Sequence, residues 1–374
     1  FGLFFSDFKN DLDISLTESG LAVGLQMLMW GLSGPIFGAI ADKYGGHKAI
    51  MLAFVFYILG IYFLYSGPNT GIFFQIDMGL LVGIGLGGTA ISIPMSIVGK
   101  HFPLSNRTIA MSLVTAVGSF GYFISPMYTS YSLINNGWIH TLYIFTIFLV
   151  IGLVIAFFVR SPSLSESIEK PSDQNTMSAL KEAFKTKSYV LLTAGFFVCG
   201  FHITLVGTHV PTYVIDRGLE TWTAAAILSL IGLFNIFGSL LSGYLSTKMK
   251  KKVILAAIYA LRGISICLFI FLPASNINAF IFGASFGFLW LSTVPATSGI
   301  VAHMFGTKHL GMLYGIVFLS HQIGSFFGSF LGGLFHDIYG SYDYAWYLAI
   351  ALSIFAAIIH VPIKEEPVLR LKTE

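Results

Sequence analysis

Gly38-Ala-Ile-Ala-Asp42-Lys-Tyr-Gly45-Gly-His-Lys48 is a short charged stretch that lies between two long apolar runs of the sequence. Glycines at its start and middle allow two helices to turn tightly and to pack closely. The charged side chains from Asp42 to Lys48 favour water over the interior of a membrane. The stretch therefore predicts a tight hairpin between two membrane helices, at one face of the bilayer.

A second, altered copy of this stretch begins later in the chain, as Gly243-Tyr-Leu-Ser-Thr-Lys-Met-Lys-Lys-Lys252. The apolar runs before the two copies also align. Gly118-Ser-Phe and Gly324-Ser-Phe occupy similar places in two further apolar runs, at nearly the same offset. These two signals together predict an internal duplication, which is common in membrane transporters.

The composition is that of an integral membrane protein. The chain has 374 residues, of which 55% are hydrophobic and 10% charged, and its mean hydropathy is +0.81. Soluble domains carry about 25% charged residues. Runs of about 20 apolar residues, the length that crosses a bilayer, lie at roughly 19–40, 48–66, 71–99, 107–131, 138–160, 188–214, 222–246, 253–273, 279–303, 309–336 and 343–363.

The chain opens on Phe1-Gly-Leu-Phe-Phe5, which does not resemble a signal peptide and looks like part of one more helix. We therefore expect an all-α protein of twelve transmembrane helices in two pseudo-symmetric six-helix halves, with the first helix truncated. A Ser-, Glu- and Lys-rich stretch separates the halves. The expected boundaries are residues 1–160 for the first half, 161–187 for a linker, 188–363 for the second half and 364–374 for a tail.

The distribution of basic residues predicts the orientation. Lysine and arginine concentrate in the cytoplasmic loops of membrane proteins, and here Lys9 and Arg217 alone fall on the face that we assign to the outside. Arg262 lies within an apolar run, and the other basic residues fall on the opposite face. We expect both termini and the linker in the cytoplasm, and the protein in the plasma (inner) membrane, as a monomer in the lipid bilayer.

Several function classes are disfavoured by what the sequence lacks. The net charge of +3 reflects the sidedness of the basic residues, so no nucleic acid partner is expected. Cys199 and Cys267 lie in apolar runs, where a packed thiol is the ordinary role, and no metal-site spacing occurs. No extramembrane segment is large enough for a catalytic or output domain, so we expect neither an enzyme nor a sensor.

No cofactor or nucleotide is expected either. The stretch from Gly83 to Gly88 satisfies the dinucleotide fingerprint G-x-G-x-x-G, which requires a preceding strand. It lies inside an apolar run instead, which indicates helix packing. A G-x-x-x-x-G-K-[ST] motif does not occur in the sequence, and this disfavours a pump driven by ATP.

Arg262 is the first candidate for substrate binding, because it lies about ten residues beyond Lys252, or roughly 15 Å along a helix. A charged residue at that depth is costly and requires a partner inside the protein. Its guanidinium could hold a substrate carboxylate by paired hydrogen bonds. Alternatively, it could tie helices together through backbone carbonyl groups.

Other polar residues within the apolar runs complete the set of candidates. His202 and His209 are two helical turns apart and share one face of their helix, so they could bind an anion or relay a proton. The alternative is that both histidines are structural and form hydrogen bonds within the core. His321 with Gln322, and also Asn235, Trp290 and Gln26, could line a polar cavity, although tryptophan is equally common in packing.

Asp77 is the one carboxylate that lies clearly within an apolar run. It could carry a coupled proton. The alternative is an aspartate near a helix start that reaches for water.

The opening stretch resembles the signature between the second and third helices of the major facilitator superfamily. The resemblance implies that Asp42 acts with Lys43 and Lys48, between Gly38 and Gly45, as a gate motif that latches the halves in one conformation. The second copy departs from the pattern, because Thr247 stands in place of the aspartate. Latching is therefore not expected there.

Two segments resemble one branch of that superfamily, the monocarboxylate-transporter-like proteins. The segment from Arg107 to Gly121, followed by Pro126, resembles their fifth helix, and the segment from His321 to Asp343 resembles the eleventh helix of bacterial members. The arginine of the animal branch falls on Gly238 and its lysine falls on Ser6, so the lactate site is not transferable.

These observations together predict a secondary active transporter that works by alternating access. The expected substrate is a small organic anion, similar to a monocarboxylate, which moves with a proton. The alternative on the same fold is an exporter of drugs or metabolites, for which 36 phenylalanines would provide aromatic surface.

Overall fold

The computed structural model describes residues 1–68, 71–90, 93–94, 97, 104–158, 176–306 and 309–368. The side chains of residues 42, 104–113, 115–116 and 176 are outside this description. The described residues form helices joined by short turns. In chain order the helices are η1 (Gly2–Phe4), α1 (Phe5–Leu12), α2 (Leu16–Tyr44), α3 (Gly46–Ser66), α4 (Gly71–Phe74), the π-helical segment η2 (Gln75–Leu81), α5 (Val82–Thr89), α7 (Leu104–Phe158), α8 (Thr176–Lys185), α9 (Lys187–Asp216), α10 (Thr221–Leu245), α11 (Lys251–Phe271), α12 (Asn276–Leu289), α13 (Thr293–Phe305), α14 (Leu310–Tyr339) and α15 (Asp343–His360).

The apolar runs of the sequence are confirmed as membrane-length helices. Among the described residues, 10 helical segments are long and apolar enough to cross a membrane, and one of them, Val117–Phe158, has 42 residues. Gly137 interrupts that segment with a φ of 78°. The rings of Tyr128 and Phe145 lie 6.4 Å apart, whereas 17 residues of straight helix would span about 25 Å. This segment is therefore two antiparallel spans, and the described part of each of the eleven predicted runs lies in one span.

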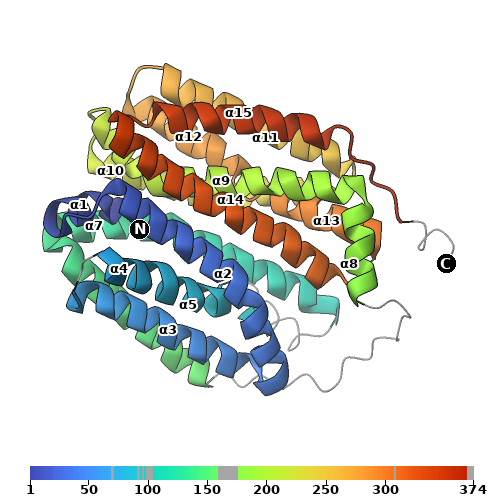
Figure 1. Ribbon diagram of the computed structural model, residues 1–374, viewed down its shortest axis with the longest axis horizontal. Coiled ribbons are helices and arrows are strands. Elements are labelled where there is room, and N and C mark those ends of the chain that lie inside the picture. The colour runs from blue at the N-terminus through green and yellow to red at the C-terminus, as the bar shows by residue number, and fades with distance from the viewer. Residues whose placement is uncertain are drawn as a thin grey trace.

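The helices divide into two groups that lie against each other (Figure 1). The first group contains α2, α3, α4, α5 and α7, and the second contains α9 to α15. Two helix pairs make the main contacts between the groups, α2 with α14 and α7 with α10. The short helices η1 and α1 precede α2, and η1 packs against α9 of the second group.

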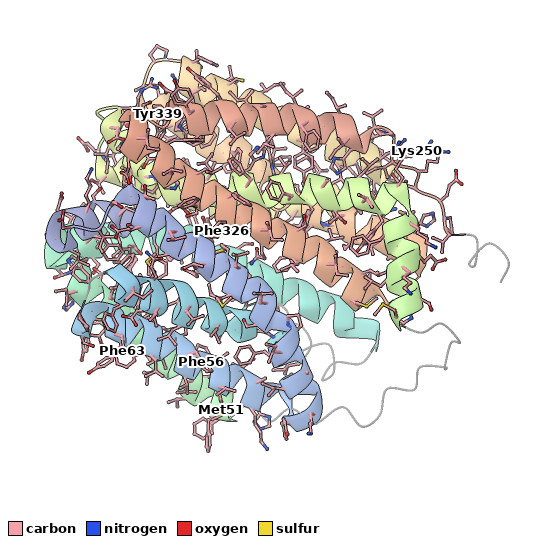
Figure 2. The ribbon with its side chains drawn as sticks, in the orientation of Figure 1. Met51, Phe56, Phe63, Lys250, Phe326 and Tyr339 are labelled. Carbon is pink, nitrogen blue, oxygen red and sulfur yellow. The ribbon has the colours of Figure 1, made fainter. Side chains whose placement is uncertain are left out.

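One end of the bundle carries most of the lysines, and we call it the basic end. It contains α8 and the turn with Lys250, which Figure 2 shows at the right, whereas Tyr339 lies at the opposite end. Helix α8 lies within the predicted linker and packs against α9. Its Ala179 and Ala183 are buried, while Phe184 is largely exposed. The helix is therefore amphipathic, with one face packed and the other exposed.

The charged stretch at the end of α2 forms the expected tight turn. Gly45 alone separates α2 from α3, and its φ of 95° is a conformation that favours glycine. The Lys43 ammonium lies 5.0 Å from the centre of the Tyr44 ring, and Lys48 is exposed. No neighbouring atom lies within 4 Å of a Cβ placed on Gly38. The side chain of Asp42 is outside the description, so the latch remains a prediction.

Glycines let α2 and α14 approach until their backbones touch. A Cβ placed on Gly333 would overlap the carbonyl oxygen of Leu16, and a Cβ on Gly20 would overlap that of Ser329. Gly83, within the fingerprint-like stretch, lies in the same way against the backbone of Gln26. Small residues at helix contacts are the usual device for close packing in membranes.

We predict that Gly333→Ala destabilises the protein, because the added methyl group overlaps Leu16 in a contact with no free space. Overpacking of this kind costs about 1–3 kcal/mol. The matched control is Gly243→Ala, since no atom lies within 4 Å of a Cβ at Gly243. That variant should be as stable as the parent or slightly more stable. Thermal unfolding in detergent measures both, and equal midpoints for the two variants would contradict the packing described here.

Candidate functional site

Asn235, near the middle of α10, connects the two groups of helices. Its Nδ2 donates to the Ser119 hydroxyl of α7 over 3.3 Å, and its Oδ1 accepts from the Leu291 N–H over 3.0 Å. The side chain is 4% exposed. A buried amide that uses both its donor and its acceptor fixes the relative position of its partners. Asn235 thus links α7 of the first group to the segment between α12 and α13.

That segment is a break in the middle of a membrane span. The span covers Asn276–Phe305, yet α12 ends at Leu289 and α13 begins at Thr293. Pro295 lies four residues after Leu291, where its ring and its missing N–H oppose a continuous helix. The Val294 N–H donates to Leu291 over 3.0 Å, in a tighter turn than that of an α-helix. The carbonyl groups of Leu289 and Trp290 therefore need other partners.

Arg262 supplies those partners from α11. Its Nε and Nη2 donate to the Leu289 carbonyl over 3.2 and 2.7 Å, and Nη2 also donates to the Trp290 carbonyl. The residue is 0% exposed, and its Nη1 has no hydrogen-bond partner among the described residues. This geometry corresponds to the second of the two roles considered above, in which the guanidinium ties helices together through carbonyl groups.

The Trp290 side chain lies between the two groups of helices. Its ring centre is 5.9 Å from that of Tyr122 in α7, and 5.7 Å from that of Phe286. A Cβ placed on Gly207 of α9 would lie 3.7 Å from the Trp290 ring and 3.5 Å from the Tyr122 hydroxyl. Trp290 therefore contacts the first group directly at the level of the break.

Gln322 makes the corresponding contact between α14 and α2. Its Nε2 donates to the Met27 carbonyl over 3.0 Å, and its Oε1 lies 3.0 Å from His321 Nδ1. The His321 ring stacks on Phe318, with the ring centres 5.6 Å apart. The two helix pairs thus place polar groups at mid-span, and we call the following set the central seam: Asn235, Trp290, His321 and Gln322 of the second group with Ser119, Tyr122 and Met27 of the first.

The other two histidine candidates lie away from the central seam. His202 Nε2 is 2.8 Å from the Ala349 carbonyl of α15, and His209 Nε2 is 2.6 Å from the Ser329 carbonyl of α14. Both side chains are 0% exposed. Their partners belong to different helices, so the two rings do not converge on one site, and each has the surroundings of a hydrogen-bonded core histidine.

Asp77 and Gln26 lie inside the first group. Asp77 is 6% exposed and falls in the π-helical segment η2, where a Cβ on Gly60 of α3 would meet its backbone carbonyl. Its carboxylate has no hydrogen bond or ion pair with the described residues. π-Helical turns interrupt regular helices at a cost and are frequent at functional sites. Gln26 is also buried, and its Oε1 has no described partner.

The two groups are closed against each other at the end opposite the basic end. There the Thr17 N–H and hydroxyl both donate to Asp337 Oδ2, over 2.7 and 2.6 Å. The carboxylate lies at the N-terminus of α2, where helix dipoles favour negative charge. In the same region His336 Nε2 lies 3.1 Å from Asp216 Oδ2.

Contacts between α2 and α14 end before the basic end. Toward that end the rings of Trp30 and Phe318 lie 5.9 Å apart, and a Cβ placed on Gly31 would lie 3.4 Å from Leu319. Beyond these residues, Cβ atoms placed on Gly38, Gly311 and Gly315 would meet no atom within 4 Å. Among the described residues, α2 and α14 therefore meet from the opposite end to the central seam, and these three glycines nearer the basic end have no neighbouring helix against them.

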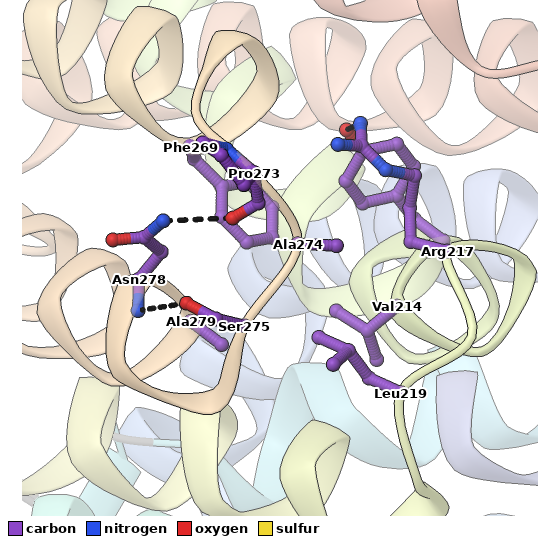
Figure 3. Close-up of a pocket in the computed structure, with 10 residues that line it drawn as sticks. Val214, Arg217, Leu219, Phe269, Pro273, Ala274, Ser275, Asn278 and Ala279 are labelled. Carbon is purple, nitrogen blue, oxygen red and sulfur yellow. Dashed lines mark hydrogen bonds between the residues drawn. The ribbon is translucent and has the colours of Figure 1, made fainter.

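A shallow surface pocket lies apart from these candidate residues (Figure 3). It is formed at the opposite end by the end of α9 and the turn between α11 and α12. Asn278 Nδ2 donates there to the Pro273 carbonyl over 2.7 Å, and Arg217 lies across from it. This pocket lies at the surface, and no residue of the central seam lines it.

Sequence reasoning identified one side of the central seam and missed the other. Asn235, Trp290, His321 and Gln322 stand out because they are polar or amphipathic groups in apolar runs. Ser119, Tyr122 and Met27 give no such signal, since serine and tyrosine occur throughout membrane helices. Pro295 within an apolar run is a readable sign of the break.

The pattern of the Major Facilitator Superfamily matches residues 1–294 and 291–373. The chain belongs to this superfamily. It is 23% identical to monocarboxylate transporter 13 of Rattus norvegicus over 93% of this chain and 80% of that protein, and 24% identical to the sialic acid transporter NanX of Escherichia coli over 93% and 83%. Its fold matches a crystal structure of a D-xylose-proton symporter, with a TM-score of 0.71 at 14% identity over 98% and 93% of the two chains.

Asn235→Ala should destabilise the protein more than Ser119→Ala does. The first change leaves the buried Leu291 N–H without its acceptor, which costs about 1–3 kcal/mol. The second removes one hydrogen bond, worth about 1 kcal/mol. Thermal unfolding of both variants and of the double variant measures this order. If Asn235→Ala is no less stable than Ser119→Ala, Asn235 does not support the break.

Proposed function

We propose that this major facilitator protein is a secondary active transporter that moves a small organic anion together with a proton, by alternating access. The observation that carries the proposal is the central seam. Polar side chains meet there at mid-membrane between two groups of helices, which are joined on one side of it by Thr17 and Asp337, while Gly38, Gly311 and Gly315 on the other side have no neighbouring atom within 4 Å. A polar contact of this kind can part and reform as the groups rock.

A carboxylate is the substrate chemistry that suits the seam best. The amides of Asn235 and Gln322 can donate to carboxylate oxygens once the groups separate, and Trp290 provides an apolar wall. An anion in a low-dielectric site also needs a positive partner. An imidazolium group can supply such a charge, and His321 is the histidine that lies beside Gln322 in the seam. The named substrates of the relatives, monocarboxylate and sialic acid, agree with this chemistry.

Asp77 is our candidate for the coupled proton. Its side chain is buried inside the first group, and none of the described residues forms a hydrogen bond or ion pair with its carboxylate. The surrounding π-helical segment provides a local irregularity that can rearrange when the proton leaves. A proton carried by the first half and an anion bound at the seam would then cross together.

Alternating access requires that the two ends open in turn. We assign the basic end to the cytoplasm, with both termini there, and the protein to the plasma (inner) membrane as a monomer. The conformation described above is then closed toward the outside by Thr17 and Asp337. The halves, residues 1–160 and 188–363, would move as units, with residues 161–187 as the linker and Asp42, Lys43 and Lys48 as the cytoplasmic latch.

Export of a larger aromatic compound is the second candidate. The aromatic contacts across the interface favour it, namely Tyr122 with Trp290 and Trp30 with Phe318. One relative, with 24% identity, is the fujikurins efflux protein of Gibberella fujikuroi.

Uptake into proteoliposomes tests the proposed function. Radiolabelled pyruvate, lactate and sialic acid are offered with and without an inward proton gradient, and empty liposomes serve as the control. We expect uptake of at least one carboxylate and its stimulation by the gradient. If the vesicles accumulate no carboxylate but expel ethidium, the export function replaces the proposed one.

Asp77→Asn should separate transport from the proton gradient. The neutral amide cannot release a proton, so uptake should no longer respond to the gradient, while exchange of substrate across the membrane continues. Asp13→Asn is the matched control, because Asp13 is exposed in a turn outside the spans. If Asp77→Asn keeps full stimulation by pH, the proton is carried by another group.

A further inference from the structure

The broken span between α12 and α13 has a polar backbone in the middle of the membrane. A break of this kind frees carbonyl and N–H groups, and each unpaired group in hydrocarbon costs several kcal/mol. In this span, three side chains form hydrogen bonds with the freed backbone groups of residues 289–292. Arg262 donates to the carbonyls of Leu289 and Trp290, and Asn235 accepts from the Leu291 N–H. Ser242 donates to the Ser292 carbonyl.

Arg262 is the one charged member of this set, and its surroundings fix its orientation. The guanidinium carbon lies 5.4 Å from the centre of the Tyr259 ring and 5.8 Å from that of the Phe286 ring. No carboxylate forms an ion pair with it among the described residues. Carbonyl oxygens and aromatic faces together replace water around the charge.

A direct role in substrate binding does not suit this geometry. Two of the three guanidinium nitrogens are engaged with the break, and the side chain is fully buried within the second half. The break itself lies between Arg262 and the central seam, because Trp290 presents its carbonyl to Arg262 and its ring to Tyr122.

We propose that Arg262 is a positioning residue that holds the span discontinuous and thereby places Trp290 and Asn235 at the central seam. Without the guanidinium, the carbonyls of Leu289 and Trp290 lose these donors, and a continuous helix would satisfy them instead. A continuous helix would rotate Trp290 away from Tyr122 and withdraw the Leu291 N–H from Asn235. The proposal rests on the proposed transport function in one respect only. That respect is the expectation that a variant in which Trp290 and Asn235 leave the central seam also loses affinity for the substrate.

Fluorine NMR tests the position of Trp290 without any substrate. The chain has 5 tryptophans, so incorporation of 5-fluorotryptophan gives a small set of resonances, and Trp290→Phe assigns the one of interest. We expect Arg262→Lys to shift or split the Trp290 resonance, because an ammonium cannot span both carbonyls as a planar fork does. The resonances of Trp138 and Trp222, which lie elsewhere, should not move.

Arg217→Lys is the matched control. Arg217 also donates to two backbone carbonyls, those of Ile270 and Leu272, but at the ordinary end of α11. It should leave the Trp290 resonance and transport unchanged. If Arg262→Lys leaves the resonance in place and yet abolishes binding of the carboxylate found in the uptake screen, Arg262 contacts substrate directly and the proposal is wrong.

A second pair of variants covers the case in which Arg262→Met fails to fold. Pro295→Ala restores an N–H and permits a continuous helix across the break. The double variant Arg262→Met, Pro295→Ala should therefore recover a monodisperse, folded protein in detergent. It should not recover the Trp290 resonance position or transport. If the double variant remains unfolded, or if it folds and transports normally, Arg262 does not have the role of stabilising the break between α12 and α13.

These outcomes are separate from those of the uptake screen. A failure to find any transported carboxylate would count against the proposed function. The fluorine resonance would still report whether Arg262 sets the position of Trp290.

Discussion

The requirement that every backbone polar group in the hydrocarbon layer has a partner is the constraint on which this structure depends. In a regular helix the backbone groups are partners of one another, and most described spans of this chain are regular helices. The span from Asn276 to Phe305 does not, and it persists because Arg262, Asn235 and Ser242 contribute side-chain partners. In the sequence, Arg262 could be a residue that binds substrate. In the structure, its hydrogen bonds to the carbonyls of the broken span account for its burial.

The same hydrogen bonds connect the break to the rest of the molecule. The Asn235 amide accepts from the Leu291 N–H and donates to the Ser119 hydroxyl. A movement of the first half would therefore displace the groups at the break. Gln322 makes a similar connection to Met27 on the other helix pair. The sequence predicts that the two halves arose by duplication, yet their structures differ in detail. The broken span belongs to the second half and the π-helical segment to the first.

Much of the fold could be predicted from the sequence, because the length of apolar runs and the placement of lysines report directly on membrane spans. The turn at Gly45 and the spans on either side of Gly137 follow the expected pattern. The candidate site was harder to predict. The sequence marks Asn235, Trp290 and Gln322 as unusual, but it does not show which residues of the other half face them. The separation of His202 from His209 depends on the helices that pack around them, which helical phase alone does not give.

The rocking of two halves about the central seam is the central claim, and spin-label distances between the halves test it most directly. Labels replace the exposed residues Asn135 and Ile338 at one end, and Leu52 and Lys250 at the other, with Cys199 and Cys267 removed. Addition of the transported carboxylate at low pH should lengthen the first distance and shorten the second. Distances that change together, or not at all while transport proceeds, would contradict the account.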